Sequence, residues 1–190
     1  MLDKLFSQVN HRLNAKWRMT DKDGNPVKLF QDNFLFRFLI KHNIVSPMFP
    51  KIPLLLGYWS YSKKVSNLVT NAGKAGDAAR LMASAVAAFT YIALGIGTTA
   101  AAATDTALGS EITTGGLART TGTVGSKTTT VTNDTATLTN TFTASGSFAV
   151  TESGVLNAAS GGTLLAHQVF SAINVVSGNN LQIEWDIQAS

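Results

Sequence analysis

Three histidines and eleven carboxylates are the residues of this 190-residue chain best suited to chemistry. His11, His42 and His167 lie far apart in the sequence, so no two of them have the short spacing with which one helix presents two metal ligands. We therefore predict that each is an ordinary polar residue without a catalytic role. The chain contains no cysteine, which excludes thiolate metal sites and disulfide bonds.

The carboxylates of the second half are the remaining candidates for acid–base chemistry. They are Asp105, Glu111, Asp134, Glu152, Glu184 and Asp186. Glu184 and Asp186 alternate with apolar residues, which places both on one face of a strand, about 7 Å apart. The ordinary explanation of this pattern is a solvent-exposed strand face. A calcium site would need converging loop oxygens, and the spacing of an EF-hand loop is absent. We predict no catalytic residue, no metal and no cofactor.

Glycine and serine motifs support the same prediction. Gly95-Ile-Gly97 lacks the third glycine of a dinucleotide loop and the Gly-Lys-Ser/Thr of a phosphate loop, so it indicates a turn. Neither Ser145-Gly146 nor Ser153-Gly154 lies in the Gly-x-Ser-x-Gly elbow of hydrolases. The sequence thus predicts a protein that is not an enzyme.

Charge divides the chain into two parts. Residues 1–82 carry 13 Lys/Arg against 5 Asp/Glu, a net charge of +8, whereas residues 83–190 carry 2 against 6, a net charge of −4. The first part is aromatic and irregular, and the second is rich in Thr, Ala and Gly. We predict a basic, apolar N-terminal arm of helices and extended segments over residues 1–82, and a Thr-rich antiparallel β-sandwich over residues 83–190.

Short alternating segments predict the sandwich. Thr occupies every odd position of residues 135–143, which indicates a half-buried strand with a Thr-lined outer face. Asn133-Asp134 before it predicts a hairpin turn. Strands at intervals of about 8–12 residues are typical of a mainly β fold, an antiparallel β-sandwich. The residues expected to face its core include Leu138, Phe142, Leu181, Ile183 and Trp185.

The N-terminal arm shows three different patterns. Apolar residues from Leu2 to Leu13 recur at helical spacing, which predicts a short amphipathic helix that docks either on its own domain or on a partner. Residues 29–42 are dense in large apolar groups that need cover. Pro47, Pro50 and Pro53 then impose extended structure. An extended chain of this kind suits an arm lying along another surface.

One segment has the length of a membrane span. Residues 81–104 contain no charge over 24 positions. Much of this stretch is Ala, Gly, Thr and Ser, with few large aliphatic side chains. We therefore predict neither a transmembrane helix nor a membrane partner.

Basic and aromatic residues of the arm are the candidate partner-anchoring residues. They are Arg12, Lys16, Trp17, Arg18, Phe34, Phe36, Phe38, Trp59, Lys63 and Lys64. Aromatic groups beside cations can also stack on bases and hold phosphates. The apolar run over residues 52–56 favours a protein partner, so we expect an acidic protein surface and no nucleic acid.

Several ordered segments of the C-terminal half carry a resemblance to a known family. They are Phe89–Thr99, Asp105–Glu111, Val150–Asn157, Gly161–Ala166 and Val169-Phe170. In this order they resemble a β-sandwich module of the structural proteins of tailed bacteriophages, of the decoration or tail-collar fibre type. The signature is a glutamate, a glycine two residues later, an apolar pair and then Gly-x-Leu-Leu-Ala. Residues 1–72 lie outside this resemblance.

The resemblance implies a non-enzymatic structural protein of a phage virion. We expect a capsid decoration or cement subunit that is anchored by its N-terminal arm to major capsid proteins. The alternatives are a tail, neck or fibre-attachment protein with tail proteins as partners, or, in another class, a glycan-binding or glycan-cleaving appendage. We also expect a homo-oligomer, and we predict a trimer. Repeated copies in a symmetric assembly need no catalytic residue, which agrees with the prediction that the chain is not an enzyme.

Overall fold

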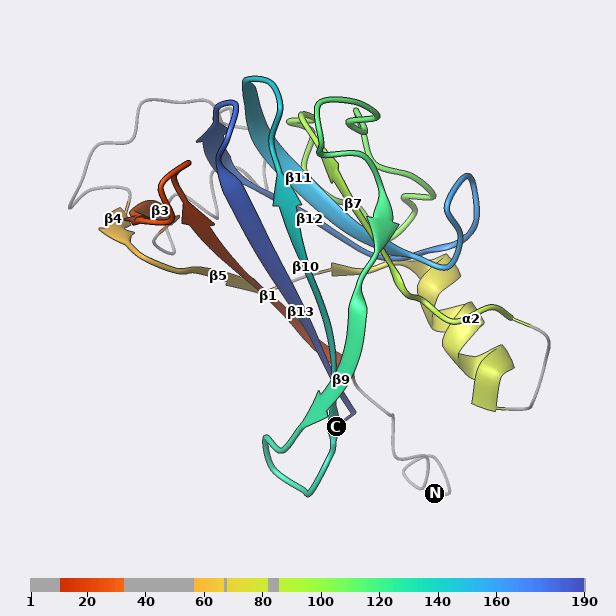
Figure 1. The fold of residues 1–190 in the computed structure, drawn as a ribbon. Helices are drawn as coiled ribbons and strands as arrows, with labels where there is room; N and C mark the ends of the chain where they lie inside the picture. Colours follow the sequence, from red (N-terminus) through yellow and green to blue (C-terminus); the bar gives the residue numbers. More distant parts are fainter. Residues whose placement is uncertain (1–10, 33–56, 67, 82–85, 190) are drawn as a thin grey trace, which may run out of the picture.

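Two antiparallel β-sheets packed face to face form the body of the protein. The computed structural model describes residues 11–32, 57–66, 68–81 and 86–189, and Figure 1 shows their arrangement. The strand order of the first sheet is β2 (Pro26–Val27), β1 (His11–Thr20), β13 (Asn180–Ala189), β10 (Thr135–Thr143) and β9 (Thr123–Lys127), and β5 (Lys63–Ser66) also pairs with β1. The order of the second sheet is β6 (Leu68–Val69), β12 (Leu164–Val175), β11 (Phe148–Leu156), β7 (Tyr91–Gly95) and β8 (Thr120–Thr121).

Two smaller elements complete the described fold. A separate two-stranded ribbon joins β3 (Leu29–Asp32) to β4 (Gly57–Ser60). Helix α2 (Asn71–Leu81) packs on β12. The Thr70 hydroxyl caps this helix by accepting the Gly73 N–H at 2.9 Å. At Gly73 the helix meets the backbone of β12 so closely that a Cβ atom would lie 2.3 Å from the Leu165 carbonyl oxygen. No helix among the described residues is long and apolar enough to cross a membrane.

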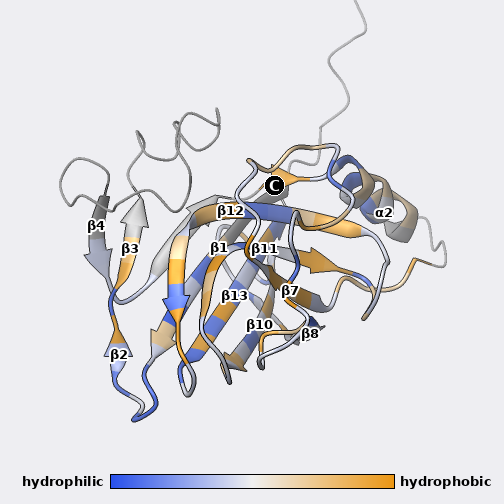
Figure 2. Cartoon of the chain, turned by 90° about the horizontal axis from the view of Figure 1, so that it is seen from above, coloured by the Kyte–Doolittle hydropathy of each residue, from blue (hydrophilic) through white to orange (hydrophobic). Residues whose placement is uncertain are grey.

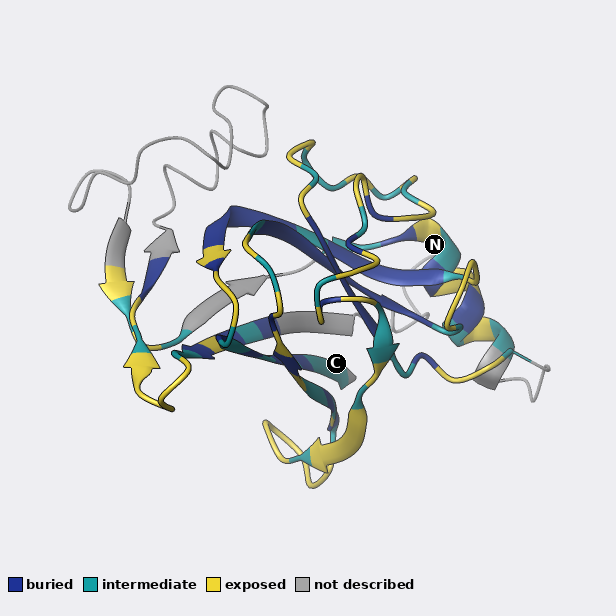
Figure 3. Ribbon diagram, turned by 45° about the horizontal axis from the view of Figure 1, so that its top comes forward, coloured by how far each residue is buried: buried dark blue, intermediate teal, exposed yellow. Residues whose placement is uncertain are grey.

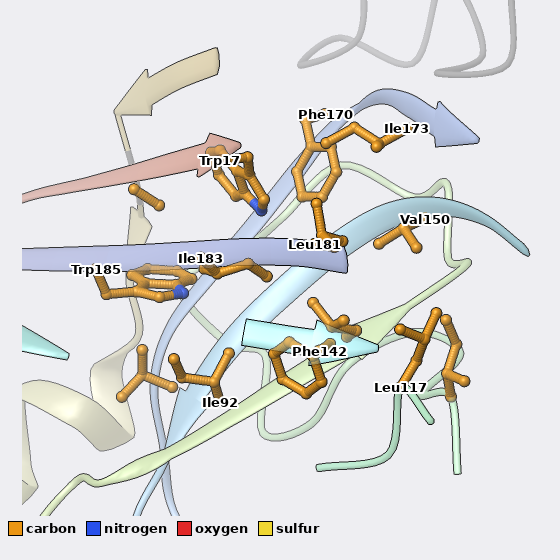
Figure 4. Packing of buried hydrophobic residues seen from close by; sticks show 14 of the residues in the cluster. Trp17, Ile92, Leu117, Phe142, Val150, Phe170, Ile173, Leu181, Ile183 and Trp185 are labelled. Atoms are coloured by element: carbon orange, nitrogen blue, oxygen red, sulfur yellow. The ribbon is translucent and has the colours of Figure 1, made fainter. Parts of the chain in front are cut away.

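The core lies between the two sheets. Trp17 and Trp185 of the first sheet and Phe170 of the second are fully buried, and Figure 4 shows them among the packed aliphatic residues. The rings of Trp17 and Phe170 meet across the core with their centroids 4.6 Å apart. The mainly β, antiparallel sandwich predicted from the sequence is therefore confirmed.

The alternation predicted for β13 is confirmed, and that predicted for β10 is confirmed from Thr137 onward but is wrong at the start of the strand, where Thr135 is buried and Ala136 is exposed. Leu181, Ile183 and Trp185 are buried, the polar residues between them are half-buried, and Figure 2 shows the resulting bands of hydropathy along β13. Leu138 and Phe142 are also buried, opposite a Thr-rich outer face. The hairpin turn before β10 is present, with Asn133 at φ 59°.

Strand β1 corrects three predictions about the N-terminal arm. Residues 11–13 belong to this strand, so the helix predicted from Leu2 to Leu13 is wrong for the part that the structure describes. All ten residues of β1 pair with β13, so this part of the predicted arm belongs to the sandwich. Trp17 was predicted to anchor a partner, but it is a core residue with 0% exposure. Period-two alternation through Ala15, Trp17 and Met19 carries these side chains into the core.

At both sides of the sandwich the chain crosses from one sheet to the other between two consecutive strands. On one side, β5 pairs with β1 in the first sheet, and the next strand, β6, pairs with β12 in the second. On the other side, β8 pairs with β7, and β9 then pairs with β10. Residues 63–66 and 68–69 of the predicted arm therefore close one side of the fold, and the boundary predicted at residue 82 does not separate two structural units.

We expect Trp17→Ala to lower the free energy of unfolding by about 3–5 kcal/mol, because it leaves a large cavity between the sheets. The control Arg18→Ala changes the next residue on β1, which is exposed, and should cost less than about 0.5 kcal/mol. Urea denaturation measures both. Equal losses for the two variants would contradict the position of β1 in the core.

Candidate functional site

The most concentrated group of buried polar residues lies on the face of the second sheet that points away from the first sheet. Glu152 is on β11, His167 is on the neighbouring β12, and Asp105 is in the long connection after β7. Glu152 is 1% exposed and His167 is 3% exposed. We call these three residues the buried triad.

The register of β11 explains how Glu152 reaches this face. Val150 and Val155 belong to the main core, whereas Leu156 packs in a second small cluster with Leu108 and Leu164. Simple alternation would put Val150 and Glu152 on the same face. A register shift against β12 falls between these two residues. Such an irregularity re-aims the side chains that follow it, and here it turns Glu152 outward under the loop.

Four donors surround the Glu152 carboxylate. Its Oε1 accepts the N–H of Gly97 at 2.9 Å and that of Ser110 at 2.7 Å, and its Oε2 accepts the N–H of Gly109 at 2.9 Å. The fourth bond joins Oε2 to Nε2 of His167 at 2.9 Å. A Cβ atom at Gly97 would lie 2.5 Å from Oε1, so the loop can approach this carboxylate only with glycine there. One side chain thus binds both ends of the loop over residues 96–110.

His167 joins this carboxylate to a second one. Its Nδ1 lies 2.8 Å from Oδ2 of Asp105, which also accepts the N–H of Ala102 at 2.8 Å. Both ring nitrogens of His167 therefore face carboxylate oxygens. Only the imidazolium form can donate from both nitrogens.

The pKa values of Glu152 and His167 agree with this hydrogen-bond arrangement. Burial alone would raise the pKa of Glu152, but the bonds from His167 and from the three backbone N–H groups hold it below its ordinary value of 4.5. Burial alone would lower the pKa of His167, but Glu152 and Asp105 raise it above its ordinary value of 6.5. Both shifts favour the charged pair, a protonated His167 against an ionised Glu152.

This arrangement stabilises a loop and does not expose a reactive group. Both oxygens of Glu152 and both ring nitrogens of His167 are bonded inside the protein. Among the residues that the structure describes, no group of three or more His, Cys, Asp or Glu has the geometry of a metal site. The chemistry available to the triad is therefore electrostatic cross-linking of β11, β12 and the loop over residues 96–110.

A second ionic cluster holds the next stretch of the same connection. Arg119 donates from Nε to Glu111 at 2.8 Å and from Nη2 to the second oxygen of that carboxylate. Its Nη1 donates to the carbonyl oxygens of Ala158 at 3.1 Å and Gly161 at 2.8 Å, in the turn between β11 and β12. Residues 96–119 are thereby tied to the second sheet at two points.

Sequence reasoning considered Glu152, His167 and Asp105 separately and did not bring them together. Glu152 and His167 are 15 positions apart, and Asp105 and His167 are 62 positions apart, so no local spacing indicates a cluster. One signal was present: Glu152 lies within a strand whose neighbours Val150, Val155 and Leu156 are apolar. A carboxylate in such a strand needs buried partners.

The pair Glu184 and Asp186 does share one strand face, as predicted, but this face is less exposed than expected. Their side chains are 24% and 16% exposed, and both contact Nζ of Lys127, at 3.3 Å and 2.6 Å. Lys127 comes from β9, two strands away, and reaches across β10. The two carboxylates act as its counter-ions.

The candidate anchoring residues are distributed over three places. Lys16 is half-buried and Arg18 is exposed, and Arg18 donates to the Gln182 side chain at 3.0 Å. Arg12 belongs to β1 as well, and Lys63 and Lys64 form the start of β5, with Lys64 in register with Lys16. Trp59 is 48% exposed on β4, edge-on to Phe30. Phe34, Phe36 and Phe38 lie outside the described residues.

Comparison of the chain with protein-family models, with curated proteins and with solved structures finds no match.

We expect Glu152→Gln to destabilise the protein by about 3 kcal/mol, since it removes the more deeply buried of the two carboxylates that face His167. The matched control Glu184→Gln removes a half-exposed carboxylate and should cost less than about 1 kcal/mol. Urea denaturation compares the two. In hydrogen exchange, the amides of residues 97, 109 and 110 should lose protection only in the Glu152 variant. Unchanged exchange there would contradict the loop-holding role.

The triad also predicts a stability profile with pH. Because the pKa of folded His167 is raised, its contribution is complete below pH 6.5 and is lost as pH rises through the folded pKa. Because the pKa of folded Glu152 is lowered, its contribution is complete above pH 4.5 and is lost as pH falls through the folded pKa. Denaturation midpoints across the pH range should fall on both sides of this window. His167→Gln should remove the alkaline decline, and a decline that persists in this variant would assign it to another group.

Proposed function

We propose that this chain is a non-enzymatic structural protein of a tailed-bacteriophage virion, and that it decorates or cements the capsid. The observation that carries the proposal is the position of the phage-like segments in the fold. β7 lies within Phe89–Thr99. The loop residues that bind Glu152 lie in Phe89–Thr99 and Asp105–Glu111, and most of β11 lies in Val150–Asn157. Gly161–Ala166 contains the start of β12. The segments that carry the resemblance therefore pack together as one sheet and its covering loop.

The roles of these residues also support a structural function. The phage-like segments contain Glu152 and the three residues whose N–H groups donate to its carboxylate, Gly97, Gly109 and Ser110. Their residue types are thus explained by loop architecture, without a substrate. A loop fixed by internal bonds is suited to a subunit that must keep one shape within an assembly.

The first sheet offers a surface for attachment to an acidic protein shell. Its outer face carries Lys16 and Arg18 on β1, and the register places Lys64 directly opposite Lys16. An acidic partner would pair with the cations of β1, so attachment through Lys16 and Arg18 is electrostatically favoured.

The proposal is tested by locating the chain in gradient-purified phage particles from a culture that carries its gene. Quantitative mass spectrometry of the particles should find it at a copy number comparable to that of the major capsid protein. Labelled antibodies should mark the head in electron micrographs. Labelling of the tail would replace the capsid assignment with a tail or neck position, and absence from particles would refute the virion proposal.

We expect the double variant Lys16→Ser/Arg18→Ser to bind particles more weakly than the unmodified protein. Binding of the unmodified protein should also weaken at high salt, since exposed charges are screened over about 8–10 Å at physiological ionic strength. The control Lys22→Ser/Lys74→Ser removes two exposed cations outside this face, in the turn before β2 and on α2. Cosedimentation with particles measures all three proteins. Equal binding by both variants would remove β1 from the attachment surface.

A further inference from the structure

Strand β9 ends the first sheet with an open edge. It pairs with β10 through Thr123–Lys127, and among the described residues nothing pairs with its other side. Its first four residues are exposed, and Figure 3 shows the strand as an exposed projection beside the body of the protein. An edge of this kind presents unpaired backbone N–H and C=O groups to another chain.

The other terminal strands differ from β9. β2, β6 and β8 are each two residues long, so their edges offer little ladder to an incoming strand. β5, which also pairs with β1 at the edge of the first sheet, is four residues long and contains Lys63 and Lys64. Short edge strands are one of the means by which natural sheets avoid edge-to-edge pairing. β9 is five residues long and contains no proline.

The charge that could protect this edge is directed elsewhere. Lys127 is the only charged residue of β9, and a lysine at an edge commonly opposes pairing. Here its ammonium group lies against Glu184 and Asp186, on the face of the sheet. The edge itself, Thr123–Ser126, is uncharged.

The adjoining turn holds the strand in one conformation. The Asp134 carboxylate accepts the N–H groups of Thr129, Thr130 and Val131 at 2.8–3.1 Å. The same carboxylate accepts a bond from the Gln188 side chain of β13 at 3.1 Å. The edge is thus ordered before any partner arrives, which lowers the entropic cost of pairing.

From these observations we propose that β9 is a homotypic β-pairing edge, and that it joins antiparallel to β9 of a second copy of this chain. Two-fold pairing centred near Gly125 places Thr123 opposite Lys127 and Val124 opposite Ser126. No like charges then face each other, because the one cation of each strand lies opposite a threonine. An uncharged edge of this type offers nothing to a strongly acidic or basic partner, which favours the second copy.

An exposed valine adds an apolar contact to this pairing. Val124 is 62% exposed, although it is in register with the buried Leu138 of β10. In the two-fold arrangement each Val124 lies directly opposite Ser126 of the second copy, on the same face as the second Val124, so its side chain packs on that serine. The interface would be small, so we expect a weak dimer that forms at high local concentration. This proposal does not depend on the virion assignment.

The experiment compares the full-length protein with two lysine variants. Val124→Lys places a charge at the edge, and the control Val131→Lys changes a valine of similar exposure, 66%, in the adjacent turn. Sedimentation velocity from low-micromolar to near-millimolar concentrations should show a monomer–dimer equilibrium. Val124→Lys should raise the dimer dissociation constant at least about tenfold, and Val131→Lys should leave it within about twofold.

Hydrogen exchange locates the interface independently. Peptides that cover residues 123–127 should exchange more slowly at high than at low protein concentration, whereas peptides that cover β11 should not change. A monomer at every concentration would overturn the proposal. So would a dimer that Val124→Lys does not weaken, or concentration-dependent protection confined to another part of the chain.

Discussion

The hydrogen bonds to the buried carboxylate of Glu152 are the interactions that hold the loop over residues 96–110 on the second sheet. An ionised carboxylate away from water is strongly unfavourable unless hydrogen bonds and an opposite charge compensate for it. Three backbone N–H groups and His167 supply that compensation. Because three of these donors belong to the loop over residues 96–110, the loop can leave the sheet only by breaking three hydrogen bonds to an ionised carboxylate. A long connection with little regular structure is therefore held in one conformation.

The same principle operates elsewhere on the described surface. Arg119 holds the next part of the connection through Glu111 and two carbonyl oxygens. Asp134 orders the turn after β9 through three backbone N–H groups. In each case one charged side chain replaces the hydrogen bonds that a helix or sheet would have provided. Loops made of small residues cannot bury enough apolar surface to order themselves, so charge-assisted bonds take over this task.

The core between the sheets has a different basis. Trp17 and Trp185 fill its centre from adjacent strands of the first sheet, and Phe170 meets Trp17 from the second. Neither indole N–H has a hydrogen-bond acceptor among the described residues. A buried donor without an acceptor costs about 1–3 kcal/mol, which packing of the large rings must offset. β1 is thus integral to the sandwich although its outer residues are the most basic of the first sheet.

The sequence by itself determined the antiparallel β class and the orientation of β10 and β13, because alternation is a local property and each strand carries its own pattern. The sequence did not predict β1. The apolar residues from Leu2 to Leu13 also fit a helical pattern, and the cations Arg12, Lys16 and Arg18 indicated a partner-binding segment. Only the tertiary structure decided that Glu152, His167 and Asp105 meet. Their contacts depend on a register shift between β11 and β12 and on backbone groups of a remote loop, and neither is expressed in the spacing of residue types.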